Sequence, residues 1–208
     1  MKHLGEKAET TSARIFLLLA VALLAGACAS TSLVNQWKSP DFSGPPLGKV
    51  LVVGVSTQPS LRRVFEDEFA ASLRTAGVQA VQSYTVITQD GQADQAVLER
   101  AVQDLEADAV LVARLVRREQ QTWTTPGYYR APAMGFYGWY SAAWIGYYEP
   151  PTVYTYDVVT VETSLYSPPR SKLLWSGITE TFAPTDVRKS TAEYAKVIIG
   201  ALRKDGFL

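Results

Sequence analysis

The chain has 208 residues, with 20 basic and 20 acidic side chains, so its formal net charge at pH 7 is zero. A balanced charge of this kind gives no indication of nucleic acid or of an anionic membrane surface as a partner. The chain holds a single cysteine, which excludes an internal disulfide.

The first 27 residues are typical of a secretory signal peptide. Lys2, Lys7 and Arg14 precede an uninterrupted apolar run at 15–25, and small residues follow it. A retained membrane helix is the alternative, but these 11 residues fall well short of the ~20 that cross a ~30 Å hydrocarbon core. We therefore expect residues 1–27 to be cleaved.

The run LLAGAC, which ends at Cys28, resembles a lipobox. This resemblance implies that Cys28 is lipidated and becomes the first residue of the mature protein. Acyl chains contribute ~0.8 kcal/mol per buried CH₂, so three of them hold a protein on a bilayer. By resemblance to proteobacterial lipoproteins, Ala29 in place of aspartate implies the inner leaflet of the outer membrane, facing the periplasm.

The mature chain has no group for the commonest enzyme chemistries. Its histidine, His3, lies in the signal, and Cys28 is consumed by the anchor. Catalysis by Ser-His-Asp or Cys-His groups is therefore excluded, as are metal sites built on nitrogen or thiolate ligands. No phosphate-binding glycine loop is present either. We expect a protein that is not an enzyme and that holds no metal or cofactor.

Residues 28–48 are rich in Ser, Thr, Pro and Gly, which predicts an irregular lipidated tether. At ~3.3 Å per residue, such a tether would hold the domain some tens of ångströms from the bilayer. Trp37 and Phe42 are unusual in a free linker, and we expect both rings to dock on the domain. Residues 49–208 are long enough for one domain with its own core.

Apolar periodicity in this domain alternates between strands and helices. Strands are expected at 49–56, 78–81 with a possible extension to 87, 107–118, 153–166 and 172–182, and helices from Ser60 to Gly77, at 92–106 and from Asp186 to Gly206. The order βαβαβ, long loop, ββα predicts an α/β (α+β) sandwich with a mixed sheet. Arg114, Arg117 and Arg118 are expected at a solvated strand end.

Three runs carry a family resemblance: KVLVVGVS at 49–56, LRTAGV at 73–78 and ADAVLV at 107–112. They resemble small periplasmic α/β domains such as the amino-terminal domain of the Tol-Pal translocation protein, the curli secretion lipoprotein and lipoprotein activators of cell-wall synthases. Together with Trp37, Pro40, Phe42 and the run KLLWSG at 172–177, they are also similar to uncharacterised envelope lipoproteins of Gram-negative bacteria. The resemblance implies a fold and a location, and it brings no catalytic residues.

The loop expected at 122–152 is the strongest candidate for function. A loop this long is uncommon unless it is functional or disordered. It carries ten aromatic residues, which we take as candidate partner-binding residues: Trp123, Tyr128, Tyr129, Phe136, Tyr137, Trp139, Tyr140, Trp144, Tyr147 and Tyr148. Such rings suit binding to a protein, a glycan or a membrane interface.

Four hypotheses follow from this loop. The rings could cover one sheet face as a satellite core. They could engage an envelope partner, a protein or a glycan, as part of a binding or scaffolding module, which is the function we favour. A glycan-cleaving or glycan-modifying enzyme would need two of the carboxylates of Glu149, Asp157, Glu162 and Glu180 to converge, ~5 to 9.5 Å apart. Finally, the segment could insert in a bilayer as part of an oligomer.

Overall fold

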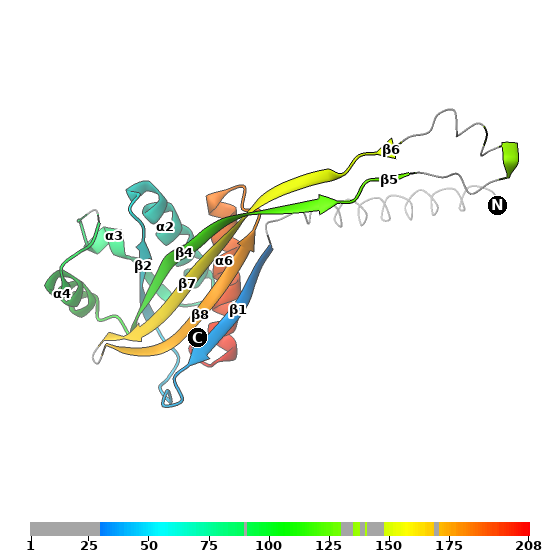
Figure 1. Cartoon of the computed structure of the whole chain (residues 1–208). Coiled ribbons are helices and arrows are strands. Elements are labelled where there is room, and N and C mark those ends of the chain that lie inside the picture. Colours follow the sequence, from blue (N-terminus) through cyan, green and yellow to red (C-terminus); the bar gives the residue numbers. More distant parts are fainter. Residues whose placement is uncertain (1–29, 90, 130–134, 138–139, 141–147, 169–170) are drawn as a thin grey trace, which may run out of the picture.

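The computed structural model describes residues 30–89, 91–129, 135–137, 140, 148–168 and 171–208. Its main sheet has six strands: β1 (Ser30–Lys38), β2 (Lys49–Val55), β3 (Gln79–Gln82), β4 (Ala109–Thr125), β7 (Thr152–Ser167) and β8 (Lys172–Phe182). They lie in the order β1-β8-β7-β4-β2-β3. Helices α2 (Pro59–Thr75) and α6 (Val187–Lys204) lie side by side on one face of this sheet (Figure 1). The expected α/β (α+β) sandwich with a mixed sheet is confirmed, in two layers.

The β2-α2-β3 unit has the expected parallel pairing, with β4 parallel to β2 on the other side. Helix α2 begins earlier than predicted, with Pro59 in its first turn and Gln58 as its N-cap, because proline suits the first helical position. Its buried stripe also differs from the expectation. Leu61 is 40% exposed, while Arg62 and Glu66 are buried.

Residues 83–87 do not continue β3 as a strand. Ser83–Val86 form the one-turn helix α3, and the hydroxyl of Ser83 donates a hydrogen bond to Oε1 of Glu66 at 2.6 Å. Helix α4 (Gln95–Leu105) follows and buries Ala101. It begins three residues later than the expected Gln92 and ends at Glu106, which adopts a left-handed conformation with φ 49°.

The second half of the fold is antiparallel. β7 pairs with β8 as the expected hairpin, and β7 also pairs with β4. Helix α6 begins where the sequence predicts, because the Asp186 side chain accepts a hydrogen bond from the backbone N–H of Lys189 at 2.9 Å. Gly206 has φ +79° just after the helix, as expected for a helix-ending glycine.

The expected irregular tether is wrong for residues 30–38, which form the edge strand β1. This strand runs antiparallel to β8, from Ser30 opposite Phe182 to Lys38 opposite Trp175. The ring of Phe42 docks as expected, 4.2 Å from that of Phe207 between centroids. Trp37 does not dock in this way, since it is 46% exposed. The described part of the fold therefore begins at Ser30, within the range expected to be a tether.

Trp175 is the largest fully buried side chain, and its indole N–H donates to Asp205 at 2.8 Å. Gly177 lies two residues along the same strand and therefore on the same face. A Cβ added at Gly177 would lie 2.3 Å from the Trp175 ring, which leaves room for glycine alone. Packing of the indole across Gly177 thus explains the W-S-G run. Tyr194 is buried on this side of the sheet, and burial raises the pKa of its hydroxyl.

Candidate functional site

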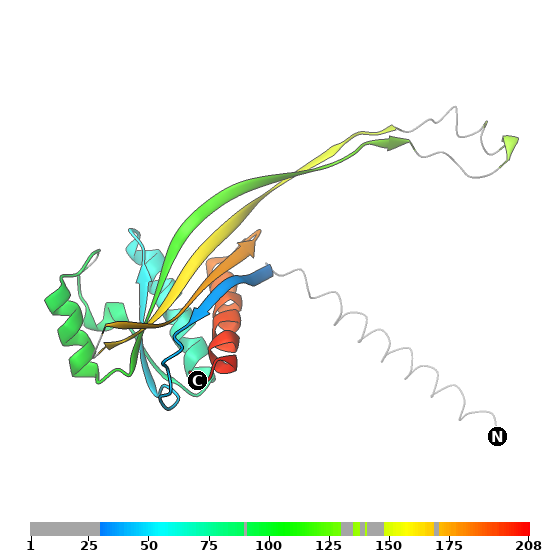
Figure 2. The same ribbon diagram turned by 60° about the horizontal axis from the view of Figure 1, so that its bottom comes forward.

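Strands β4 and β7 continue as a two-stranded ribbon beyond the rest of the sheet. β2 pairs with β4 only as far as Arg114, and β8 pairs with β7 only from Val158, whereas β4 and β7 stay paired out to Thr125 and Thr152. The short pair β5 (Tyr128–Tyr129) and β6 (Tyr148–Glu149) follows. We call the described residues among 119–157 the arm. It extends away from the body in both views (Figures 1 and 2).

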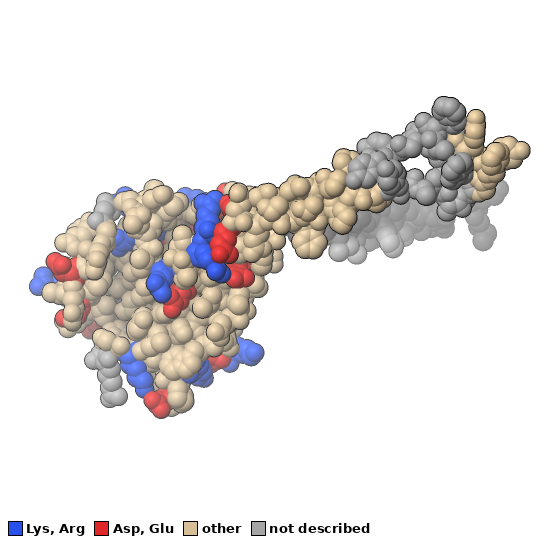
Figure 3. Space-filling model, viewed as in Figure 1, with Lys and Arg blue, Asp and Glu red and all other residues tan. Residues whose placement is uncertain are grey.

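Residues 120–129 and 150–156 of the arm contain no Lys, Arg, Asp or Glu, and Glu149 in β6 is the one charged residue of its described strands beyond Glu119 and Asp157. Ion pairs surround the base of the arm: Arg114–Glu162 at 2.5 Å, Arg118–Asp157 at 2.7 Å and Arg117–Glu119 at 3.2 Å. We call these six residues the charged collar. Figure 3 shows its blue and red atoms at the junction and, on the face in view, only tan atoms on the described part of the arm beyond it.

The register divides the arm into two different faces, because successive side chains of a strand point to opposite sides. On one face Trp123 lies opposite Tyr154, and Gln121 lies opposite Tyr156. The other face carries threonine and valine, with Thr122 opposite Thr155 and Thr124 opposite Val153. We call the first the aromatic face and the second the threonine face.

The aromatic face continues onto the body. The Tyr156 hydroxyl donates to the Gln121 side chain at 3.2 Å, and the Tyr156 ring lies 6.4 Å from that of Phe182. Phe182 pairs with Val158 on one side and with Ser30 on the other. A stripe of rings therefore runs from Trp123 along the arm to Phe182, beside the first residue of β1.

The candidate residues whose side chains are described are exposed: Trp123 is 65% exposed, Tyr128 48%, Phe136 69%, Tyr137 86% and Tyr140 53%. At the tip, the Phe136 ring lies 5.4 Å from that of Tyr137 and 6.1 Å from that of Tyr140. Tyr129 and Tyr148 pair through their backbones. Trp139, Trp144 and Tyr147 lie outside the described residues.

Sequence reasoning missed three further exposed or half-buried residues of the arm: Val153, Tyr154 and Tyr156. The alternating run VYTY at 153–156 was the available signal. The satellite-core hypothesis is wrong for the described rings, which do not cover the sheet. An isolated two-stranded ribbon is marginal in water, and large exposed apolar patches mark interaction sites. The arm thus has the properties expected of an interaction surface.

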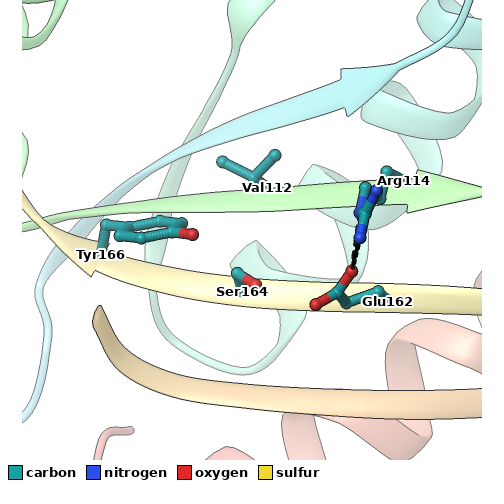
Figure 4. A pocket seen from close by; sticks show the side chains of 5 residues that line it. All are labelled: Val112, Arg114, Glu162, Ser164 and Tyr166. Atoms are coloured by element: carbon teal, nitrogen blue, oxygen red, sulfur yellow. Dashed lines mark hydrogen bonds and ion pairs between the residues drawn. The ribbon is translucent and has the colours of Figure 1, made fainter.

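The face of the sheet opposite α2 and α6 carries a shallow pocket of about 230 Å³. Val112, Arg114, Glu162, Ser164 and Tyr166 line it, all from β4 and β7, and the Arg114–Glu162 ion pair closes one side (Figure 4). Glu162 is the one carboxylate among these lining residues, and it is paired with Arg114.

The four carboxylates named for a glycan enzyme are not gathered in this pocket. Asp157 pairs with Arg118, and alternation places it on the sheet face opposite to Glu162. Glu180 lies on the same face as Glu162, diagonally across β7 and β8, but it does not line the pocket. The side chain of Glu149 lies outside the described residues.

Neither a metal-binding cluster nor a membrane-spanning helix is found among the described residues. No group of three or more His, Cys, Asp or Glu side chains in this part of the chain is placed to hold a metal ion. None of the helices described there is long and apolar enough to cross a membrane.

No protein-family model matches the chain, and no curated protein matches its sequence. Solved structures of similar shape include the PelC dodecamer from Paraburkholderia phytofirmans, with a TM-score of 0.44 and 16% identity over 82% of this chain and 96% of that one. Lipoprotein GNA1162 from Neisseria meningitidis gives a TM-score of 0.41 and 15% identity over 76% and 96%. A putative neuraminyllactose-binding hemagglutinin homolog from Helicobacter pylori gives 0.32 and 12% over 83% and 91%.

Proposed function

We propose that this chain is a lipoprotein anchored through Cys28 in the inner leaflet of the outer membrane, facing the periplasm. In this proposal it acts as a non-enzymatic binding or scaffolding module that engages an envelope partner through the arm. The observation that carries the proposal is the arm itself, a ribbon with few charges and with exposed rings that no described part of the body covers.

The separation of the buried core in the body from the exposed rings on the arm supports this function. The body has its own core, whose buried members come mainly from the sheet and from α2 and α6, and none of them lies in the arm beyond Val158. Interfaces draw most of their binding energy from a few aromatic anchors, and Trp and Tyr are the residues enriched there. Rings held on a projecting ribbon suit that role better than catalysis.

Deleting residues 122–155 and joining Gln121 to Tyr156, its partner in the register of β4 and β7, through an Asn-Gly turn tests this function. We expect the shortened lipoprotein to keep its thermal unfolding transition, because the core is intact, and to lose the envelope components that co-purify with the wild type. A matched pair of double variants locates the effect: Trp123→Ser with Tyr154→Ser should weaken co-purification, while Thr122→Ser with Thr155→Ser should not. Retention of the same components by the deletion variant would contradict the proposal.

A further inference from the structure

β1, the strand that follows the proposed anchor, begins at the end of the sheet from which the arm projects. β1 enters the sheet at Ser30, opposite Phe182, and Phe182 is opposite Val158, the residue next to the arm. Figures 1 and 2 show the first residues of β1 beside the base of the arm and the carboxyl end of α6 at the other end of the body. The site of acylation, Cys28, is two residues before Ser30.

The link from Cys28 to β1 is short compared with the arm. Two residues span at most ~7 Å, so a lipidated Cys28 would hold this end of the sheet against the bilayer surface. From Glu119 to Tyr129 the arm reaches up to ~35 Å beyond the body at ~3.3 Å per residue. An arm several times longer than the link to the anchor, starting from the same end, lies within reach of the membrane.

The chemistry of the arm fits a lipid surface. Glu149 is the one charged residue of the described strands beyond the collar, and Trp123, Tyr154 and Tyr156 share one face that runs back to Phe182 and Ser30. Trp and Tyr are favoured at membrane–water interfaces, where their rings sit at the level of the headgroups. The threonine face has hydroxyls to present to water.

We propose that the aromatic face of the arm docks on the bilayer that holds the Cys28 anchor, as a second membrane contact of the same protein. This inference rests on the proposed function and names the partner of the arm as lipid. The backbone limits how deeply the arm can enter the bilayer. The outer edges of the described arm have no neighbouring strand beyond Arg114 on β4 and before Val158 on β7. Unpaired backbone groups cost several kcal/mol each in hydrocarbon. The arm therefore lies in the interfacial layer, where water and headgroups reach its edges.

Fluorescence quenching tests this contact on the intact acylated lipoprotein. Because Cys28 is blocked by lipid, Tyr154→Cys and Thr155→Cys each introduce a single free thiol, on the aromatic and the threonine face respectively. Each variant is labelled with an environment-sensitive dye and reconstituted in vesicles of phosphatidylethanolamine and phosphatidylglycerol that carry brominated acyl chains. We expect strong quenching of the dye at 154 by the brominated lipid, and quenching of the dye at 155 by aqueous iodide instead.

Equal exposure of both dyes to iodide, with no quenching by brominated lipid, would overturn the membrane contact. If the dye at 154 then became shielded only after addition of an envelope protein extract or of peptidoglycan fragments, the arm would bind protein or glycan, and the proposed function would stand without this inference. If the arm deletion also retained every co-purifying component, the proposed function itself would fail.

Discussion

Replacing Glu66 with alanine is expected to lower the free energy of unfolding by about 3 kcal/mol or more, because it leaves a buried guanidinium without its counter-ion. The side chain of Glu66 is fully buried and that of Arg62 is 8% exposed, and the two are 3.0 Å apart. The Glu66 carboxylate also accepts hydrogen bonds from the backbone N–H groups of Gly54 at 2.9 Å and Tyr84 at 3.0 Å, and from the Ser83 hydroxyl. One carboxylate thus joins β2, α2 and α3.

Urea unfolding of the mature protein measures this effect, with Glu68→Ala as the matched control. Glu68 lies on the same helix and pairs with Arg188 at 2.7 Å, but its side chain is 26% exposed and that of Arg188 is 65% exposed. Exposed ion pairs contribute ~0 to 1 kcal/mol, so the control should change little. Equal losses in the two variants would show that the Glu66 network has no special role in stability.

Replacing Cys28 with alanine is expected to abolish acylation and the processing that depends on it. Cys28 is the sole cysteine of the chain, so the variant has no thiol to which a diacylglyceryl group can be attached. Metabolic labelling with a palmitate analogue should then give no labelled band, and the protein should stay at the size of the precursor. Ser30→Ala, two residues away, should leave both readouts unchanged.

Labelling of the Cys28→Ala variant, or its processing to the wild-type size, would show that Cys28 is not the anchor. The membrane inference would then lose its geometrical basis, since it depends on the short link from Cys28 to β1.

Elements with a strong local pattern could be predicted from the sequence. β8 has the predicted bounds, 172–182, and α6 begins after the predicted Asp186, because an apolar period and a cap are local signals. β1 could not be predicted, since its Ser- and Thr-rich stretch becomes a strand only by pairing with β8, more than a hundred residues away. Tertiary pairing of this kind overrides the local preference for an irregular linker.

The sequence predicted which aromatic residues make up the candidate site, but it did not predict that they lie on a projecting two-stranded ribbon. The ten aromatic residues marked the segment, yet nothing local showed that β4 and β7 stay paired to Thr125 and Thr152 and hold the rings away from the body. The Glu66 network was missed because charged residues on a buried helix stripe are rare unless paired. Arg62 and Glu66, four residues apart and in step with Phe69 and Leu73, were the available signal.

The central claim, that the arm rather than the open sheet face is the contact surface, is tested most directly by photo-crosslinking in the native envelope. A photoreactive amino acid is placed at Tyr154 in one variant and at Val55 in another; these residues are 58% and 57% exposed, the first on the arm and the second at the end of β2. We expect irradiation to give adducts, with lipid or with an envelope component, from position 154 and none from position 55. Adducts from position 55 with none from position 154 would contradict the account.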